Sequence, residues 1–171
     1  MENIEEKKQQ NICEYIIHMY QTEDLLRVYE MDIDKIETHV IHHLPVEAEE
    51  KIEFRNWYLS IKEEMEKEDV VYHGHLSRVQ AHVDELTMLH HQLLEEDKNY
   101  VTVYTEAEPF INHHIQLSEG KIDNPIQVCL NGVYGLLLLR LNGKQVEEDL
   151  MKRLDHFGNV LSYLSMKYKQ D

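Results

Sequence analysis

The sequence has few residues that interrupt helices and few that carry positive charge. Its 171 residues include only six glycines and three prolines, a composition that favours long helices. Seventeen lysines and arginines stand against 33 aspartates and glutamates, which gives a formal net charge of -16. A surface of that sign repels phosphate backbones and anionic lipids. We therefore expect no nucleic-acid partner and no association with membranes.

Cysteine is scarce, and export or membrane-spanning segments are missing from the pattern. Cys13 and Cys129 stand far apart and outside any CxxC pair, which predicts buried structural thiols in a reducing compartment. The first residues are acidic where a secretory signal would be basic. The most hydrophobic run, residues 133–141, is about half the roughly 20 residues that a membrane helix needs. These features predict a cytoplasmic protein.

Sequence motifs of the large enzyme classes are also lacking. The chain contains no Gly-x-Ser-x-Gly elbow, no Gly-rich phosphate loop and no dinucleotide fingerprint after a strand. The sequence therefore predicts no cofactor and favours a protein without catalytic activity.

Apolar residues recur at helical spacing along almost the whole chain, which predicts an all-α fold. We expect one domain over residues 1–171, a bundle of about seven helices. The predicted helices span residues 4–29, 33–44, 45–67, 76–93, 100–114, 125–141 and 150–168. The sixth is apolar almost all round, which predicts that it is the central and most buried helix. Pro109 should break or kink the fifth, and a short strand near Val101 is the alternative there.

Two N-terminal stretches and two later segments resemble a known family. They are the runs Asn11-Ile12-Cys13-Glu14-Tyr15-Ile16 and Tyr20-Gln21-Thr22-Glu23-Asp24-Leu25-Leu26-Arg27, followed by Tyr134-Gly135-Leu136-Leu137-Leu138 and Tyr163-Leu164. The chain resembles a family of uncharacterised all-helical bacterial proteins, a domain of unknown function common in Bacteroides-like bacteria. The resemblance covers nearly the whole chain and implies no activity.

Polar residues interrupt the apolar face of the first predicted helix and form the candidate site. Asn11, Glu14 and His18 fall on one edge of that face, and Glu23 falls near its middle. A carboxylate there must be paired, hydrogen-bonded or protonated. Arg27, one turn further on, is the nearest candidate partner. A structural ion pair and a ligand-binding carboxylate both fit this pattern.

Histidine is unusually frequent, with 12 residues, and three of them suggest a metal site. His18, His90 and His114 fall on the inward faces of three predicted helices, so they could hold zinc or iron together with Glu14 or Glu23. The chain has neither Glu-x-x-His nor His-Glu-x-x-His, the spacings that aim both donors at one metal. We therefore expect no bound metal, and we expect these histidines to be hydrogen-bonded within the fold.

Three functions remain in competition, the third being a plain structural domain that works only inside a larger complex. The first is a cytoplasmic interaction or small-ligand-sensing helical module, with a protein partner or self-association into a homo-oligomer and with a small molecule as a further possible ligand. The alternative is a metal-dependent helical-bundle enzyme, with zinc or iron held by His18, His90 and His114.

Overall fold

The computed structural model describes residues 4–170, apart from the side chains of residues 5 and 170, and within this part it is helical without any strand. The prediction of an all-α fold is confirmed. The helices are α1 (Ile4–Gln10), α2 (Ile12–Val28), α3 (Ile33–His39), the short 3-10 helix η1 (Ile41–His43), α4 (Ala48–Lys67), α5 (Ser77–Glu96), α6 (Lys98–Leu117), α7 (Pro125–Leu141) and α8 (Glu148–Gln170).

Side-chain caps decide where several helices begin. Asn11, Asp32, Asp97 and Asn124 each precede a helix, and the side chain of each accepts a backbone N–H from its first turn. Such caps satisfy donors that have no partner inside the helix. The cap at Asn11 explains why the first predicted helix is two helices, α1 and α2, and so why residues 4–170 form eight α-helices where seven were expected.

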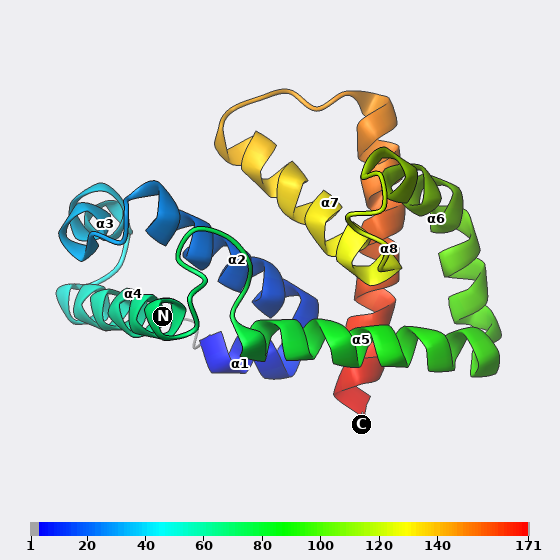
Figure 1. The fold of residues 1–171 in the computed structure, drawn as a ribbon, viewed down its shortest axis with the longest axis horizontal. Helices are drawn as coiled ribbons and strands as arrows, with labels where there is room; N and C mark the ends of the chain where they lie inside the picture. Colours follow the sequence, from blue (N-terminus) through cyan, green and yellow to red (C-terminus); the bar gives the residue numbers. More distant parts are fainter. Residues whose placement is uncertain (1–3, 171) are drawn as a thin grey trace.

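Two predictions about proline need correction or refinement. Pro45 was expected to open the third predicted helix, but α4 begins three residues later, at Ala48. Pro109 lies inside α6, which is continuous through it and changes direction along its length (Figure 1). The proline therefore bends this helix without breaking it, because only one backbone hydrogen bond is lost. Val101 belongs to the helix, so the alternative of a strand there is wrong.

The helices form two groups that share α2. On one side, α3, η1 and α4 pack against one another, and α2 contacts α3 and α4. On the other side, α5, α6, α7 and α8 pack against one another, and α2 contacts α5, α7 and α8. Figure 1 shows α2 running between these groups. Nine of its 17 residues are buried, so α2 is the helix around which the core is built.

The prediction that the sixth predicted helix, α7, would be the most buried is wrong for half of its length. It is central in the sense that it contacts α2, α5, α6 and α8, but only four of its 17 residues are buried. All four precede Asn131. From Val133 onward its side chains are partly or fully exposed, because α7 and α8 diverge toward the loop that joins them (Figure 1).

Close packing of α7 on α8 is confined to the buried half. A Cβ added at Gly132 would lie 2.7 Å from Cδ2 of Phe157 and 3.2 Å from Cδ2 of Leu154, so glycine is required for this approach. A Cβ at Gly135, one turn later, meets nothing within 4 Å. The glycines thus mark the point at which the two helices separate.

None of the helices within residues 4–170 combines the length and the apolar character that crossing a membrane requires.

Candidate functional site

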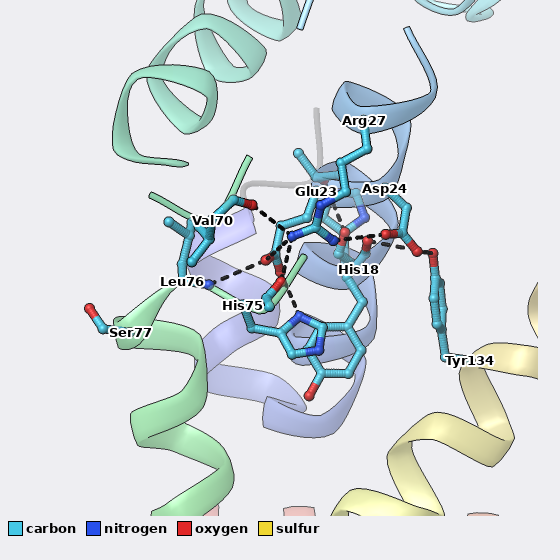
Figure 2. A network of polar contacts seen from close by, with 12 residues as sticks. His18, Glu23, Asp24, Arg27, Val70, His75, Leu76, Ser77 and Tyr134 are labelled. Atoms are coloured by element: carbon cyan, nitrogen blue, oxygen red, sulfur yellow. Dashed lines mark hydrogen bonds and ion pairs between the residues drawn. The ribbon is translucent and has the colours of Figure 1, made fainter. Parts of the chain in front are cut away.

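Glu23 is fully buried, with 0 % of its surface exposed, as its place on the apolar stripe of α2 predicts. Its Oε1 lies 3.3 Å from Nδ1 of His75, and its Oε2 accepts the backbone N–H of Leu76 at 3.2 Å. The nearest guanidinium nitrogen of Arg27 is 3.9 Å from Oε2. Figure 2 shows the carboxylate between these groups. Arg27, the partner expected from the sequence, is therefore near the carboxylate, but the closer contacts come from His75 and Leu76.

Arg27 ties α2 to the connection between α4 and α5. Its guanidinium donates to the backbone carbonyls of Val70 at 3.0 Å, Val71 at 3.3 Å and Gly74. It also donates to Oδ1 of Asp24 at 3.0 Å. A charged donor fork that satisfies several buried or half-buried carbonyls at once holds a loop in a single conformation.

The same group of side chains reaches α7. The hydroxyl of Tyr134 donates to Oδ2 of Asp24 at 2.6 Å (Figure 2), and burial together with that carboxylate raises the pKa of Tyr134. The ring of His75 stacks on Tyr20 at 3.9 Å between centroids. We refer to Glu23, Asp24, Arg27, His75 and Tyr134 as the Glu23 cluster. The partners of its buried carboxylate come from the chain itself, so it joins α2, α7 and the α4–α5 loop.

The remaining residues of the predicted polar site lie elsewhere. Asn11 caps α2, and its side-chain oxygen also accepts the hydroxyl of Ser165 in α8 at 3.0 Å. Glu14 is exposed and faces Lys7 at 3.6 Å. Burial lowers the pKa of His18, whose ring lies 6.5 Å from that of Trp57. The structure therefore brings Glu23 and Arg27 together, whereas the side chains of Asn11, Glu14 and His18 face Ser165, Lys7 and Trp57.

The histidines of the metal alternative are engaged with aromatic rings. His90 is buried, and its Nδ1 lies 2.7 Å from the hydroxyl of Tyr100; burial lowers its pKa to about 4. His114 packs on the ring of Phe157. In the part of the chain that the structure describes, no three His, Cys, Asp or Glu side chains come together as a metal site. The geometry thus offers nothing that favours the metal-dependent enzyme.

The two cysteines are buried free thiols. The Sγ of Cys13 donates to the carbonyl of Leu161 at 3.5 Å, and burial raises the pKa of Cys13 to about 12. Burial also raises the pKa of Cys129. Since the thiolate is the reactive form of cysteine, neither residue is poised as a nucleophile.

A cavity of about 400 Å³ lies where α7 and α8 separate, with α2 closing its third side. We refer to it as the α7 groove. It is lined mostly by apolar atoms, and its residues are Asn11, Cys13, Glu14, Ile17, Val133, Leu136, Leu137, Arg140, Gly158, Leu161 and Ser162. Its volume is in the range of small-molecule sites, roughly 300–1,000 Å³.

The walls of the α7 groove have two features that simple packing does not require. Gly158 stands inside the 23-residue helix α8, yet a Cβ there would meet nothing within 4 Å. Arg140, at the end of α7, has only the sulfur of Met151 as a hydrogen-bond partner among the described residues, at 3.6 Å. Sulfur is a weak acceptor. The groove is therefore open and apolar, with a guanidinium that lacks an anionic partner.

Sequence reasoning missed this groove because it treated every apolar residue of α7 as buried. A signal was present in the spacing. Val133, Leu136, Leu137 and Arg140 follow one another at i, i+3, i+4 and i+7, which places an arginine at the end of an apolar stripe. A glycine at position 158 within a predicted helix was a second signal.

Comparison with known proteins identifies one family. The family described as "Domain of unknown function (DUF4924)" matches residues 1–171. The chain belongs to this family. No curated protein and no solved structure matches it. The membership agrees with the resemblance drawn from the sequence, and a function has to be argued from the groove and the cluster themselves.

Proposed function

We propose that this DUF4924 protein is a binding module that takes up an apolar ligand or a segment of a partner protein in the α7 groove. The observation that carries the proposal is Gly158. Glycine in the interior of a helix is less favourable than alanine by about 1 kcal/mol, and no neighbouring atom needs the space that it leaves. A ligand in the groove would occupy the space that Gly158 leaves open.

The exposed apolar residues of α7 support the same proposal. Leu138 is 37 % exposed and Leu141 is 62 % exposed. Leu141 stands one turn beyond Leu137, which lines the groove, whereas Leu138 lies on another side of α7. Single exposed leucines are ordinary on protein surfaces, but an exposed leucine that extends the apolar lining of a cavity is typical of a binding site.

The state of the reactive groups favours binding over catalysis. The carboxylate of Glu23 is occupied by His75, Leu76 and Arg27, and the pKa of both thiols is raised by burial. These groups are held by the fold rather than presented to a substrate. We therefore assign the Glu23 cluster a structural role, which is to hold the α4–α5 loop against α2.

The proposal includes self-association as a second form of binding. The exposed side chains of Leu138 and Leu141 could be covered by the same stripe of a second copy, since isologous contacts are the commonest in homo-oligomers. The net charge of -16 opposes close approach of two copies, although salt screens that repulsion beyond roughly 8–10 Å. We place the protein in the cytoplasm on the basis of its composition and its free thiols.

Binding of the neutral fluorescent dye Nile red to the purified full chain tests the proposal. We expect the wild-type protein to enhance its emission saturably. Gly158→Leu should abolish this signal, because the new side chain occupies the open space of the groove. Ile52→Asp, at a residue of α4 that is 62 % exposed, is the matched control and should bind as the wild type does.

Light scattering coupled to size-exclusion chromatography completes the test, because it shows whether the wild type is a monomer or an oligomer. A dimer that Leu141→Asp converts to a monomer would assign the groove to a second copy. Dye binding that Gly158→Leu leaves unchanged, together with a monomer at all concentrations, would contradict the proposed function.

A further inference from the structure

We infer that the ligand of the α7 groove is a long-chain carboxylate, a single-chain anionic amphiphile whose headgroup binds Arg140 and whose hydrocarbon chain lies between α7 and α8. This inference rests on the proposed function and specifies the chemistry of its ligand. It depends on three observations: the unpaired guanidinium of Arg140, the position of Arg140 at one end of the groove, and the apolar lining between the two ends.

Arg140 differs from the other arginines of the chain, which number five in all. Arg27, Arg55 and Arg78 each lie within 3.0 Å of at least one carboxylate oxygen, and Arg153 lies over the ring of Phe110. Arg140 has neither kind of partner among the described residues. The chain has 33 acidic residues, yet none of the described ones pairs with Arg140. This arginine lies beside an apolar groove, where it is suited to bind the carboxylate of a ligand.

The guanidinium stands at one end of the groove. Its hydrogen bond to Met151 carries the side chain from α7 across to α8. Along α7 the lining runs from Val133 to Arg140, seven residues that correspond to about 10 Å of helix. An extended hydrocarbon chain can lie along this distance with its charged end at Arg140.

The lining between these ends is suited to a chain without polar groups. Ile17, Val133, Leu136 and Leu137 line it from α2 and α7, and Gly158 removes the side chain that would fill it from α8. The lining also includes the polar side chains of Asn11 and Glu14. They already have partners, in Ser165 and Lys7 respectively.

Charge and size select a carboxylate over other anions and over a protein. A guanidinium matches the two oxygens of a carboxylate with two parallel N–H donors. A doubly charged phosphate would meet stronger repulsion from the net charge of -16. A specific protein interface takes about 20–30 residues a side, whereas eleven residues line the groove. Its volume of about 400 Å³ is that of a small-molecule site.

Calorimetric titration of the full chain with three ten-carbon probes tests the inference. Decanoate carries the proposed headgroup, decanol is its neutral counterpart, and decyltrimethylammonium carries the opposite charge; all are used below the concentrations at which they form micelles. We expect decanoate to bind about fivefold more tightly than decanol, the ratio that about 1 kcal/mol from a partly exposed ion pair gives. The cationic probe should bind most weakly.

Substitutions then separate the headgroup from the chain. Arg140→Gln should weaken decanoate about fivefold and leave decanol unchanged, while Arg153→Gln, the matched control, should change neither. Gly158→Leu should remove binding of all three probes; far-UV circular dichroism confirms that each variant is folded.

The outcomes distinguish this inference from the proposed function. Equal affinities for the three probes, all abolished by Gly158→Leu, would overturn the long-chain carboxylate and leave the binding groove intact. Unchanged decanoate affinity in Arg140→Gln would also overturn it. If no probe binds and Nile red does not bind either, both the inference and the proposed function fail.

Discussion

The Glu23 cluster and the α7 groove both lie beside α2 and α7, but their side chains differ in whether they have partners within the chain. In the cluster, the buried carboxylate and the guanidinium of Arg27 are hydrogen-bonded to the chain's own groups. In the groove, mostly apolar walls border an open space, and among the described residues Arg140 is hydrogen-bonded only to the sulfur of Met151. The cluster is complete without a ligand, and the groove is not.

This difference indicates where to look for function in an uncharacterised helical protein. A buried charge attracts attention, because it is costly and often functional. Here the buried charge is explained by the loop that it holds. The more informative features are a glycine that no contact requires and an arginine without a carboxylate, since both lack an explanation within the fold.

The largest expected effect tests whether the cluster is structural. Glu23→Ala should lower the free energy of unfolding by about 3–5 kcal/mol, because it leaves the Leu76 N–H and part of the Arg27 charge without a partner in a buried site. Urea denaturation measures this. Glu23→Gln, which keeps one acceptor, should cost about 1–3 kcal/mol.

The matched control for this prediction is Glu30→Ala, which removes a carboxylate that is 80 % exposed and paired with Lys35. Its effect should stay within about 0.5 kcal/mol. If Glu23→Ala is equally mild, the cluster does not hold the loop, and the contrast with the groove disappears. If ligand binding is lost at unchanged stability, the cluster is part of the functional site.

A second prediction concerns another buried polar pair whose members are partners of each other, His90 and Tyr100. The pKa of His90 is lowered to about 4 in the folded state, against about 6.5 when unfolded. The unfolded chain therefore binds the proton first, so stability contributed by neutral His90 is lost as the pH falls from about 6.5 to about 4. The loss amounts to about 3 kcal/mol. Unfolding of the wild type and of His90→Gln between pH 7 and pH 4.5 should show a stability difference that shrinks toward acid; a constant difference would exclude this role.

The third prediction concerns the close packing of α7 on α8 at Gly132. Gly132→Ala should lower the free energy of unfolding by about 1–2 kcal/mol, because the clash of its Cβ with Phe157 outweighs the better helix propensity of alanine. Thermal and urea denaturation both report on it. A gain in stability would show that α7 and α8 are not in close contact even at Gly132.

The smallest expected effect is at Gly158, where α7 and α8 are separated by the groove. Gly158→Ala should raise the free energy of unfolding by about 0.5–1 kcal/mol, since alanine is the better helix former and its Cβ meets no atom. The opposite signs expected at Gly132 and Gly158 provide an internal control. If Gly158→Ala destabilises the protein, the space at Gly158 is filled by the chain, and the argument for the groove is lost.

Several features could be predicted because they depend on local chemistry. The periodicity of apolar residues was sufficient for the all-α class and for most helix positions, and the caps at Asp32 and Asn124 begin α3 and α7 where the sequence places them. The burial of Glu23 followed from its place on the stripe that contains Ile16 and Met19. Each of these depends on residues within a few turns of one helix.

Other features depended on how distant segments meet. The partner that completes Glu23, His75, is 52 residues away and arrives through the α4–α5 loop, so helical spacing could suggest only Arg27. The sequence of α7 is apolar on every side from Val133 to Leu139, but how much of it is buried depends on the angle between α7 and α8. Helical periodicity determines which face of a helix is apolar, whereas only the packing of whole helices decides whether that face is covered, and this is why the groove became visible in the tertiary structure alone.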